Sequence, residues 1–168
     1  NKKVLCEAVE NNNIEIIKLL LSLNKIDINE GKIPRNIFQL SNIEEKSFIN
    51  YAAECNSLKC FKYLFLNHAN LDDDSFSCAI YGGNTEIIRI IDQNGSSNIN
   101  DNEYQFININ VKDKDYCSYT KFCPFETSIM THQNDLFDWL LEHYEIKNTI
   151  SCLKCSILNG NTHTYLCL

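Results

Sequence analysis

The nine cysteines are the residues of this sequence best able to do chemistry, because thiolates bind metals and attack electrophiles. Cys152 and Cys155 form a C-x-x-C pair, and Cys117, Cys123 and His163 are further potential ligands. A structural zinc site of the ribbon type needs two such pairs, and the sequence offers one. On a helix the two thiols would lie one turn apart, with one of them facing the core. We therefore expect no metal and no cofactor, and keep a thiol- or zinc-dependent activity as an alternative.

Acidic residues and histidines are the next candidates. The run of aspartates at 72–74 lacks the glycine and the distal glutamate of a calcium loop, and Asp73 or Asp74 could instead cap the helix predicted after it. Each histidine lies near a predicted helix end or turn, with no serine or cysteine at a matching position: His68, His132, His143 and His163. No nucleophile–base pattern is visible. We expect no catalytic residue and no enzymatic activity.

The glycine pair Gly82-Gly83 precedes an amphipathic segment, which is where a phosphate-binding loop would lie. Such a loop would occur once, after a strand. The segment around the pair, CAIYGGNTEIIRIIDQNG at 78–95, instead aligns with four other segments of the chain, at 7–24, 51–68, 127–144 and 155–168. The pair is therefore predicted to form a turn between two helices, in a pattern that occurs five times.

The five copies share their pattern of side chains. Each copy has a small residue, which is Ala8, Ala52, Ala79, Ser128 or Ser156. An apolar residue stands three positions earlier, at Leu5, Ile49, Phe76, Phe125 and Leu153. In the second half of four copies a polar residue stands between apolar ones, at Lys18, Lys62, Arg89 and Asp138. Spacing of this kind predicts an apolar stripe along each helix, and one helix pair can bury its stripes only by stacking on another.

Two longer intervals between the copies predict irregular insertions at about 25–46 and 95–122. Part of the second, QFININV, alternates apolar and polar residues and could form a strand or a hairpin arm, or else a long finger. Four aromatic residues of this insertion have no assigned core: Tyr104, Phe106, Tyr116 and Tyr119. Because aromatic side chains anchor interfaces, we predict that they bind a partner; the alternative is that they pack the insertion against the helices.

The repeated segments resemble ankyrin repeats. NNIEIIKLLLSLNKIDIN at 12–29, LKCFKYLFLNHANLD at 58–72 and EIIRIIDQNGSSNIN at 86–100 are similar to the second half of such a repeat. SFINYAA at 47–53 stands where the family has Thr-Pro-Leu-His-x-Ala-Ala, although no copy keeps the Thr-Pro or the His. The chain looks most like a divergent ankyrin-like domain of unknown function that is expanded in parasitic protists. The resemblance implies an all-α solenoid, a single domain over 1–168 with repeats at about 3–24, 47–70, 74–95, 123–144 and 150–168.

The resemblance also implies a non-enzymatic scaffold or interaction module. It would bind a protein partner through the repeat turns, the concave surface of the first helices and the insertions. An alternative is an architectural subunit fixed in a large assembly of the cytoskeletal type. Because both ends of the chain interrupt the pattern, at Asn1 and Leu168, we expect it to be part of a longer protein.

Composition restricts the partners further. The net charge is −7 and no dense cluster of Lys and Arg is present, which argues against nucleic-acid binding. The longest apolar run is far shorter than the roughly 20 residues that cross a bilayer, so we expect no membrane partner. An odd number of irregularly spaced cysteines predicts reduced thiols and hence a cytoplasmic location, or a cytoskeletal one under the architectural alternative.

Overall fold

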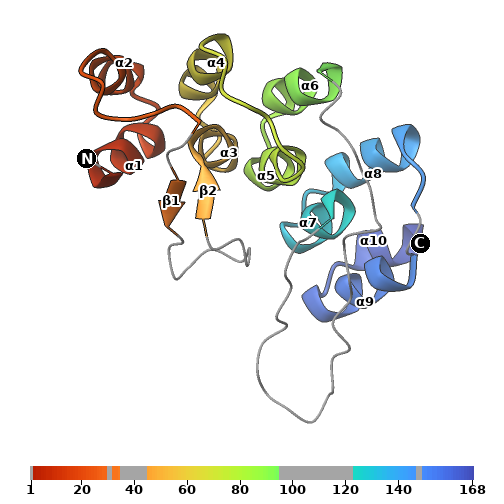
Figure 1. The fold of residues 1–168 in the computed structure, drawn as a ribbon. Helices are drawn as coiled ribbons and strands as arrows, with labels where there is room; N and C mark the ends of the chain where they lie inside the picture. Colours follow the sequence, from red (N-terminus) through yellow and green to blue (C-terminus); the bar gives the residue numbers. More distant parts are fainter. Residues whose placement is uncertain (1, 30–31, 35–44, 95–122, 147–148) are drawn as a thin grey trace. The chain divides into compact units, whose positions relative to one another are not determined.

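The structure is a computed structural model that describes residues 2–29, 32–34, 45–94, 123–146 and 149–168 (Figure 1). Most of these residues are helical and the two strands are three residues each, which confirms the all-α fold class. The helices, in chain order, are α1 (Lys2–Glu10), α2 (Ile14–Ser22), α3 (Phe48–Glu54), α4 (Leu58–Leu66), α5 (Ser75–Gly82), α6 (Thr85–Gln93), α7 (Pro124–Met130), α8 (Asn134–His143), α9 (Thr149–Asn159) and α10 (Thr162–Cys167). The described residues form two compact units, one up to Asn94 and one from Cys123 onwards.

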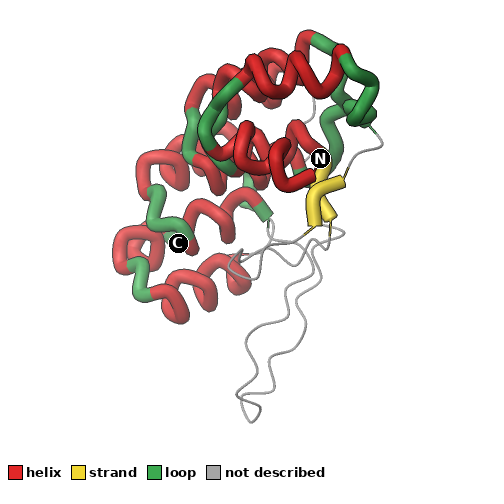
Figure 2. The backbone as a smooth tube through the Cα atoms, turned by 90° about the vertical axis from the view of Figure 1, so that its left-hand side faces the viewer, coloured by secondary structure: helices red, strands yellow, loops and turns green. Residues whose placement is uncertain are grey.

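The first unit contains three helix pairs, α1–α2, α3–α4 and α5–α6. The first helices pack in the order α1, α3, α5, and the second helices pack in the order α2, α4, α6 (Figure 1). Two short strands, β1 (Lys32–Pro34) and β2 (Glu45–Ser47), lie side by side (Figure 2). They are antiparallel, with Ile33 paired with Lys46, and both contact α3. β1 lies within the first predicted insertion, at about 25–46, and β2 spans its end, where the sequence predicts irregular structure.

The second unit contains two helix pairs, α7–α8 and α9–α10. The first helices α7 and α9 pack against each other, and so do the second helices α8 and α10. Pro124 stands at the start of α7, where its missing N–H costs no helical hydrogen bond. Cys123 and Glu126 form a capping box that satisfies two of the free N–H groups at this end.

The turn inside each helix pair confirms the interpretation of the glycine pair. One residue of every turn adopts a left-handed conformation: Asn12 (φ 51°), Asn56 (φ 56°), Gly83 (φ 70°), His132 (φ 55°) and Gly160 (φ 65°). Glycine and asparagine tolerate this region best. Gly82 has a different reason to be glycine, because a Cβ there would lie 2.1 Å from the carbonyl oxygen of Ala53 on α3. The two glycines therefore permit a turn and a close helix contact.

The turns also connect successive helix pairs in the first unit. The side-chain oxygen of Asn12 accepts hydrogen bonds from the backbone N–H groups of Lys59 and Cys60 in α4, at 3.0 and 3.3 Å. The side-chain amide of Asn84 donates to Asn56 at 2.5 Å. Each turn thus holds the start of the second helix in the next pair.

The predicted core positions are buried. The small residues Ala8, Ala52, Ala79, Ser128 and Ser156 are at most 1% exposed. Four of the five apolar residues that precede them are buried as well: Leu5, Ile49, Phe76 and Phe125. Leu153 in α9 is only half-buried. The shared pattern therefore identifies the side chains that helices use to pack on one another.

Asp74 is the N-cap residue of α5, at a position that the sequence suggested, but its side chain makes no capping hydrogen bond, and the carboxylate of Asp72 holds the loop instead. Asp72, rather than Asp73 or Asp74, accepts a hydrogen bond from the backbone N–H of Asp74 at 3.0 Å. The same Asp72 oxygen accepts from the side-chain amide of Asn50 in α3 at 2.7 Å. Asp72 therefore joins the loop to the neighbouring helix pair.

Candidate functional site

The aromatic residues predicted to bind a partner, Tyr104, Phe106, Tyr116 and Tyr119, lie outside the described residues, as does Cys117. That prediction stays a prediction. The described residues that could do chemistry are the remaining cysteines and the four histidines.

The C-x-x-C pair is buried on α9. The sequence predicts that one thiol faces the core, but Cys152 is 2% exposed and Cys155 is 3% exposed, so both do. The reason is that α9 packs against α7 on one side and α10 on another. Cys155 donates a weak hydrogen bond to the backbone oxygen of Glu126, 3.8 Å from its sulfur.

A second thiol lies beside Cys152. A hydrogen bond with Cys152, together with burial, raises the pKa of Cys123 well above its ordinary value. A raised pKa keeps the thiol protonated, whereas a metal ligand or a nucleophile must be a thiolate. The carboxylate of the buried Glu126 accepts hydrogen bonds from the hydroxyl of Ser151 and the backbone N–H of Cys123. We interpret this cluster as a packed polar contact between α7 and α9.

Three of the histidines have local structural roles. His68 and His132 are left-handed residues after α4 and within the α7–α8 turn. The ring of His143 stacks on that of Trp139 with centroids 4.7 Å apart, and its Nδ1 lies 2.8 Å from the Trp139 backbone oxygen. His163 differs, because it faces side chains of two helices.

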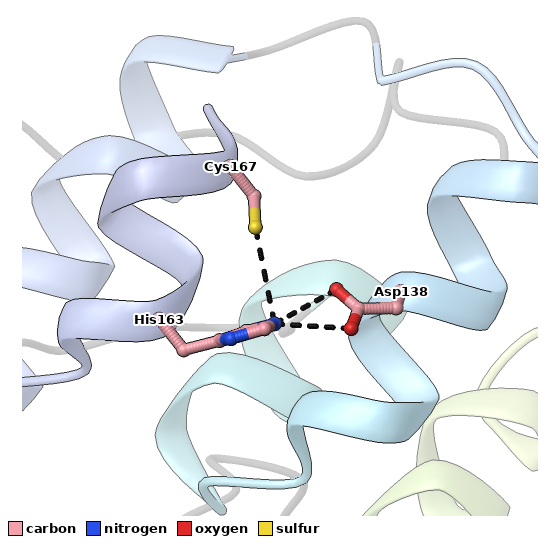
Figure 3. Close-up of side chains that lie close together, drawn as sticks. All are labelled: Asp138, His163 and Cys167. Atoms are coloured by element: carbon pink, nitrogen blue, oxygen red, sulfur yellow. Dashed lines mark hydrogen bonds and ion pairs between the residues drawn. The ribbon is translucent and has the colours of Figure 1, made fainter.

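A group of three polar side chains converges between α8 and α10 (Figure 3). His163 Nε2 lies 2.9 Å from Oδ1 and 3.0 Å from Oδ2 of Asp138. The sulfur of Cys167 lies 3.8 Å from the same nitrogen. One ligand atom from each residue can be chosen so that all three lie within 4.8 Å of one another. We call Asp138, His163 and Cys167 the α8–α10 cluster.

Helix geometry explains how the cluster forms. His163 and Cys167 are four residues apart on α10, so their side chains project from the same face of the helix. Asp138 projects from α8, which packs beside α10. Solvent reaches the group, since the side chains of His163 and Asp138 are 41% and 46% exposed and Cys167 is exposed.

The start of α10 is fixed by buried hydrogen bonds. The side-chain amide of Asn161 donates to the backbone oxygen of Ile129 at 3.1 Å and to Asn134 at 3.0 Å, while its oxygen caps α10 at the N–H of Thr164. The hydroxyls of Thr164 and Ser156 lie 2.8 Å apart in the core. The helix that carries His163 and Cys167 is thereby held against both of its neighbours.

The sequence pattern did not lead to this cluster, although it contains a signal for it. Asp138 occupies the polar position that Lys18, Lys62 and Arg89 occupy in other copies, so it reverses the charge there. His163 occupies the position of Glu86, which in the first unit pairs with Lys62. The alignment shows which residues are equivalent, but it does not show that these two positions contact each other across neighbouring helix pairs.

The arrangement is a poor match to nucleophilic catalysis. A cysteine–histidine–aspartate relay needs the two nitrogens of the imidazole to face different partners. Here both the carboxylate and the thiol approach Nε2. An oxygen, a nitrogen and a sulfur that converge on one point are instead suited to binding one shared ligand.

None of the helices in the described ranges combines the length and the apolar character that a bilayer-spanning segment requires. No protein-family model matches the chain, and no curated protein sequence is significantly similar to it.

Proposed function

We propose that the chain is an ankyrin-like repeat module that binds a protein partner and has no enzymatic activity. The observation that supports this most directly is the repetition of one helix–turn–helix plan, with a left-handed residue in every turn, the small position buried in all five copies and the apolar position buried in four. Arrays of this kind bury a continuous core and present a regular series of turns, which suits recognition of extended protein surfaces.

Among the described residues, the turns between the helices of each pair are the surface that we propose binds the partner. The residue just before the left-handed one is exposed in the first and last turns, at Asn11 and Asn159. By contrast, every residue of α3 and of α7 is buried apart from Met130, so these two first helices leave little side-chain surface for a partner. The proposed binding surface therefore consists of the turns together with the insertions.

An affinity purification with matched variants tests this proposal. The bait is the purified chain, exposed to an extract of the cells it comes from, and captured proteins are identified by mass spectrometry. The turn variant carries Asn11→Arg and Asn159→Arg, one change in each unit. The control carries Leu66→Arg and Ile150→Arg, which add the same charge at side chains that are 75% and 68% exposed and lie away from these turns.

We expect one or more proteins to be enriched by the wild type and the control but not by the turn variant. Circular dichroism should show equal helicity for all three baits, since each substitution is at an exposed position. Failure of the wild type to enrich any protein over a bare matrix would contradict the proposal. Equal capture by the turn variant would contradict the assignment of the turns as the binding surface.

A further inference from the structure

We propose that the α8–α10 cluster of Asp138, His163 and Cys167 is a binding site for a divalent metal ion of the zinc class. The donor set carries the first part of the argument. It combines a thiol, an imidazole and a carboxylate, and these are the three side-chain types that bind Zn²⁺ in proteins. Magnesium and calcium select oxygen ligands, so a set containing sulfur and nitrogen disfavours them.

The distances carry the second part. A tetrahedral zinc ion with bonds of about 2.0–2.3 Å holds a nitrogen and an oxygen about 3.3 Å apart, and a nitrogen and a sulfur about 3.6 Å apart. In the structure Nε2 of His163 lies 2.9 and 3.0 Å from the two oxygens of Asp138 and 3.8 Å from the sulfur of Cys167. Shifts of a few tenths of an ångström would bring these two pairs to ligand spacing. The remaining pair, an Asp138 oxygen and the Cys167 sulfur, lies within 4.8 Å and has to close to about 3.6 Å. Side chains this exposed can make such shifts without disturbing the core.

A comparison within the chain carries the third part. In the first unit the equivalent positions hold Lys62 and Glu86, whose charged atoms lie 2.5 Å apart. An ammonium group cannot bind a metal ion, so that pair serves only as a link between helices. At the α8–α10 contact the acid Asp138 stands at the position of the lysine, and the imidazole of His163 stands at the position of the glutamate. Cys167 adds a third donor one helical turn away (Figure 3). A simple ion pair would not need the thiol.

Uptake of the ion is a ligand exchange without oxidation or reduction. The Cys167 thiol loses its proton to solvent as the sulfur–metal bond forms. The hydrogen bond from Nε2 of His163 to Asp138 breaks, and the Nε2 proton passes through solvent to Nδ1, so that the neutral ring binds the metal through Nε2. One oxygen of Asp138 binds the metal in place of that hydrogen bond. Three protein ligands leave a fourth position for water, and binding weakens at low pH because protons compete for the ligands.

The test uses Co²⁺ as a spectroscopic probe for Zn²⁺ with the full 168-residue chain in the reduced state. A cobalt–thiolate bond gives a charge-transfer band in the near ultraviolet, and four-coordinate cobalt gives intense visible bands. We expect one equivalent of Co²⁺ to produce both sets of bands, and Zn²⁺ to displace the cobalt and abolish them. Zinc should also protect Cys167 from alkylation, as read by mass spectrometry of the modified peptide.

The variants are Cys167→Ser, Asp138→Asn and His163→Gln. Cys167→Ser should abolish the charge-transfer band, and the other two should each weaken cobalt binding more than about tenfold, since even the loss of an outer-shell partner costs 10–100-fold. Matched controls are Cys55→Ser and His143→Gln, which remove a thiol and an imidazole outside the cluster and should leave the bands unchanged. The proposal is overturned if cobalt produces no thiolate band, or if the band survives in Cys167→Ser.

Discussion

His163 on α10 meets Asp138 on α8 at the same pair of repeat positions where Glu86 on α6 meets Lys62 on α4, with the acidic residue on the earlier helix instead of the later one. In both units the contact joins second helices of successive helix pairs. All four side chains are between 41% and 50% exposed. The position is therefore a recurring polar link whose chemistry can change without disturbing the core beneath it.

The energetic weight of this link should be small. Exposed ion pairs are screened by water and salt, and typically contribute 0.2–1 kcal/mol. A double-mutant cycle of Lys62→Met and Glu86→Gln should give a coupling free energy below about 1 kcal/mol in urea unfolding, decreasing further at high salt. Lys59→Met on the same helix is the control and should show no coupling to Glu86. A coupling above 2 kcal/mol would show that the link stabilises the fold.

The buried ion pair in the first unit should behave differently. Lys46 on β2 and Glu54 at the end of α3 form an ion pair in which each side chain is 5% exposed. Lys46→Met leaves a buried carboxylate without its partner, which should lower the free energy of unfolding by about 3–5 kcal/mol. Adding Glu54→Met removes the unpaired charge and should recover most of that loss. Equal stability of the single and double variants in urea unfolding would contradict this account.

Gly82 should be the least replaceable glycine among those the structure describes. Its missing Cβ lets α5 approach the backbone of α3, where the nearest atom would be the Ala53 oxygen at 2.1 Å. Because backbone rather than a flexible side chain must move, Gly82→Ala should destabilise the chain by about 3 kcal/mol, at the upper end of overpacking costs. Thermal unfolding followed by circular dichroism measures the loss.

A second glycine supplies the control. At Gly160 a Cβ would meet open space, and only the left-handed φ of 65° favours glycine. Gly160→Asn should therefore be nearly neutral, since asparagine occupies the equivalent position at Asn12 and Asn56. If Gly160→Asn proved as destabilising as Gly82→Ala, it would be wrong that Gly82 is needed for a helix contact and Gly160 only for the conformation of a turn.

Much of the fold could be predicted from the sequence because the same pattern of small, apolar and polar residues occurs in several copies. A pattern that is weak evidence for helices in one segment is strong evidence when it is repeated. A single alanine does not identify a contact between helices. Ala8, Ala52 and Ala79 together do, because each follows an apolar residue by three positions. The turn was predictable for the same reason. The short strand pair was not, because three-residue strands such as Lys32–Pro34 carry too little periodicity to stand out.

The α8–α10 cluster could not be predicted, because its geometry depends on how two helix pairs align. Asp138 and His163 meet only when the second helices pack in register, and the sequence gives no distance between helices. The two thiols of the C-x-x-C pair illustrate the same limit. Spacing alone predicts one buried thiol, whereas the contacts of α9 with both α7 and α10 bury Cys152 and Cys155 together.

Three thiols in the first unit, of which Cys60 and Cys78 are buried and Cys55 is half-buried, should make its stability fall at alkaline pH. Burial raises the pKa of Cys55 to about 11 and that of Cys60 to about 11, from an ordinary value of 9.0. Burial also raises the pKa of Cys78. In the unfolded chain these thiols lose their protons near pH 9, so between pH 9 and 11 the unfolded state binds fewer protons than the folded state. The free energy of unfolding must then decrease as pH rises through this range.

Urea unfolding at a series of pH values, in the presence of reductant, tests this dependence. The wild type should lose stability steadily from pH 9 to 11. Cys55→Ser and Cys60→Ala each remove one titrating group, so each should give a shallower slope, even though Cys60→Ala also lowers stability at neutral pH by leaving a small cavity. Lysines titrate in the same pH range in the wild type and in each variant. The difference between their slopes of unfolding free energy against pH therefore reports the thiol alone. Parallel curves for the wild type and both variants would show that these thiols do not couple folding to pH.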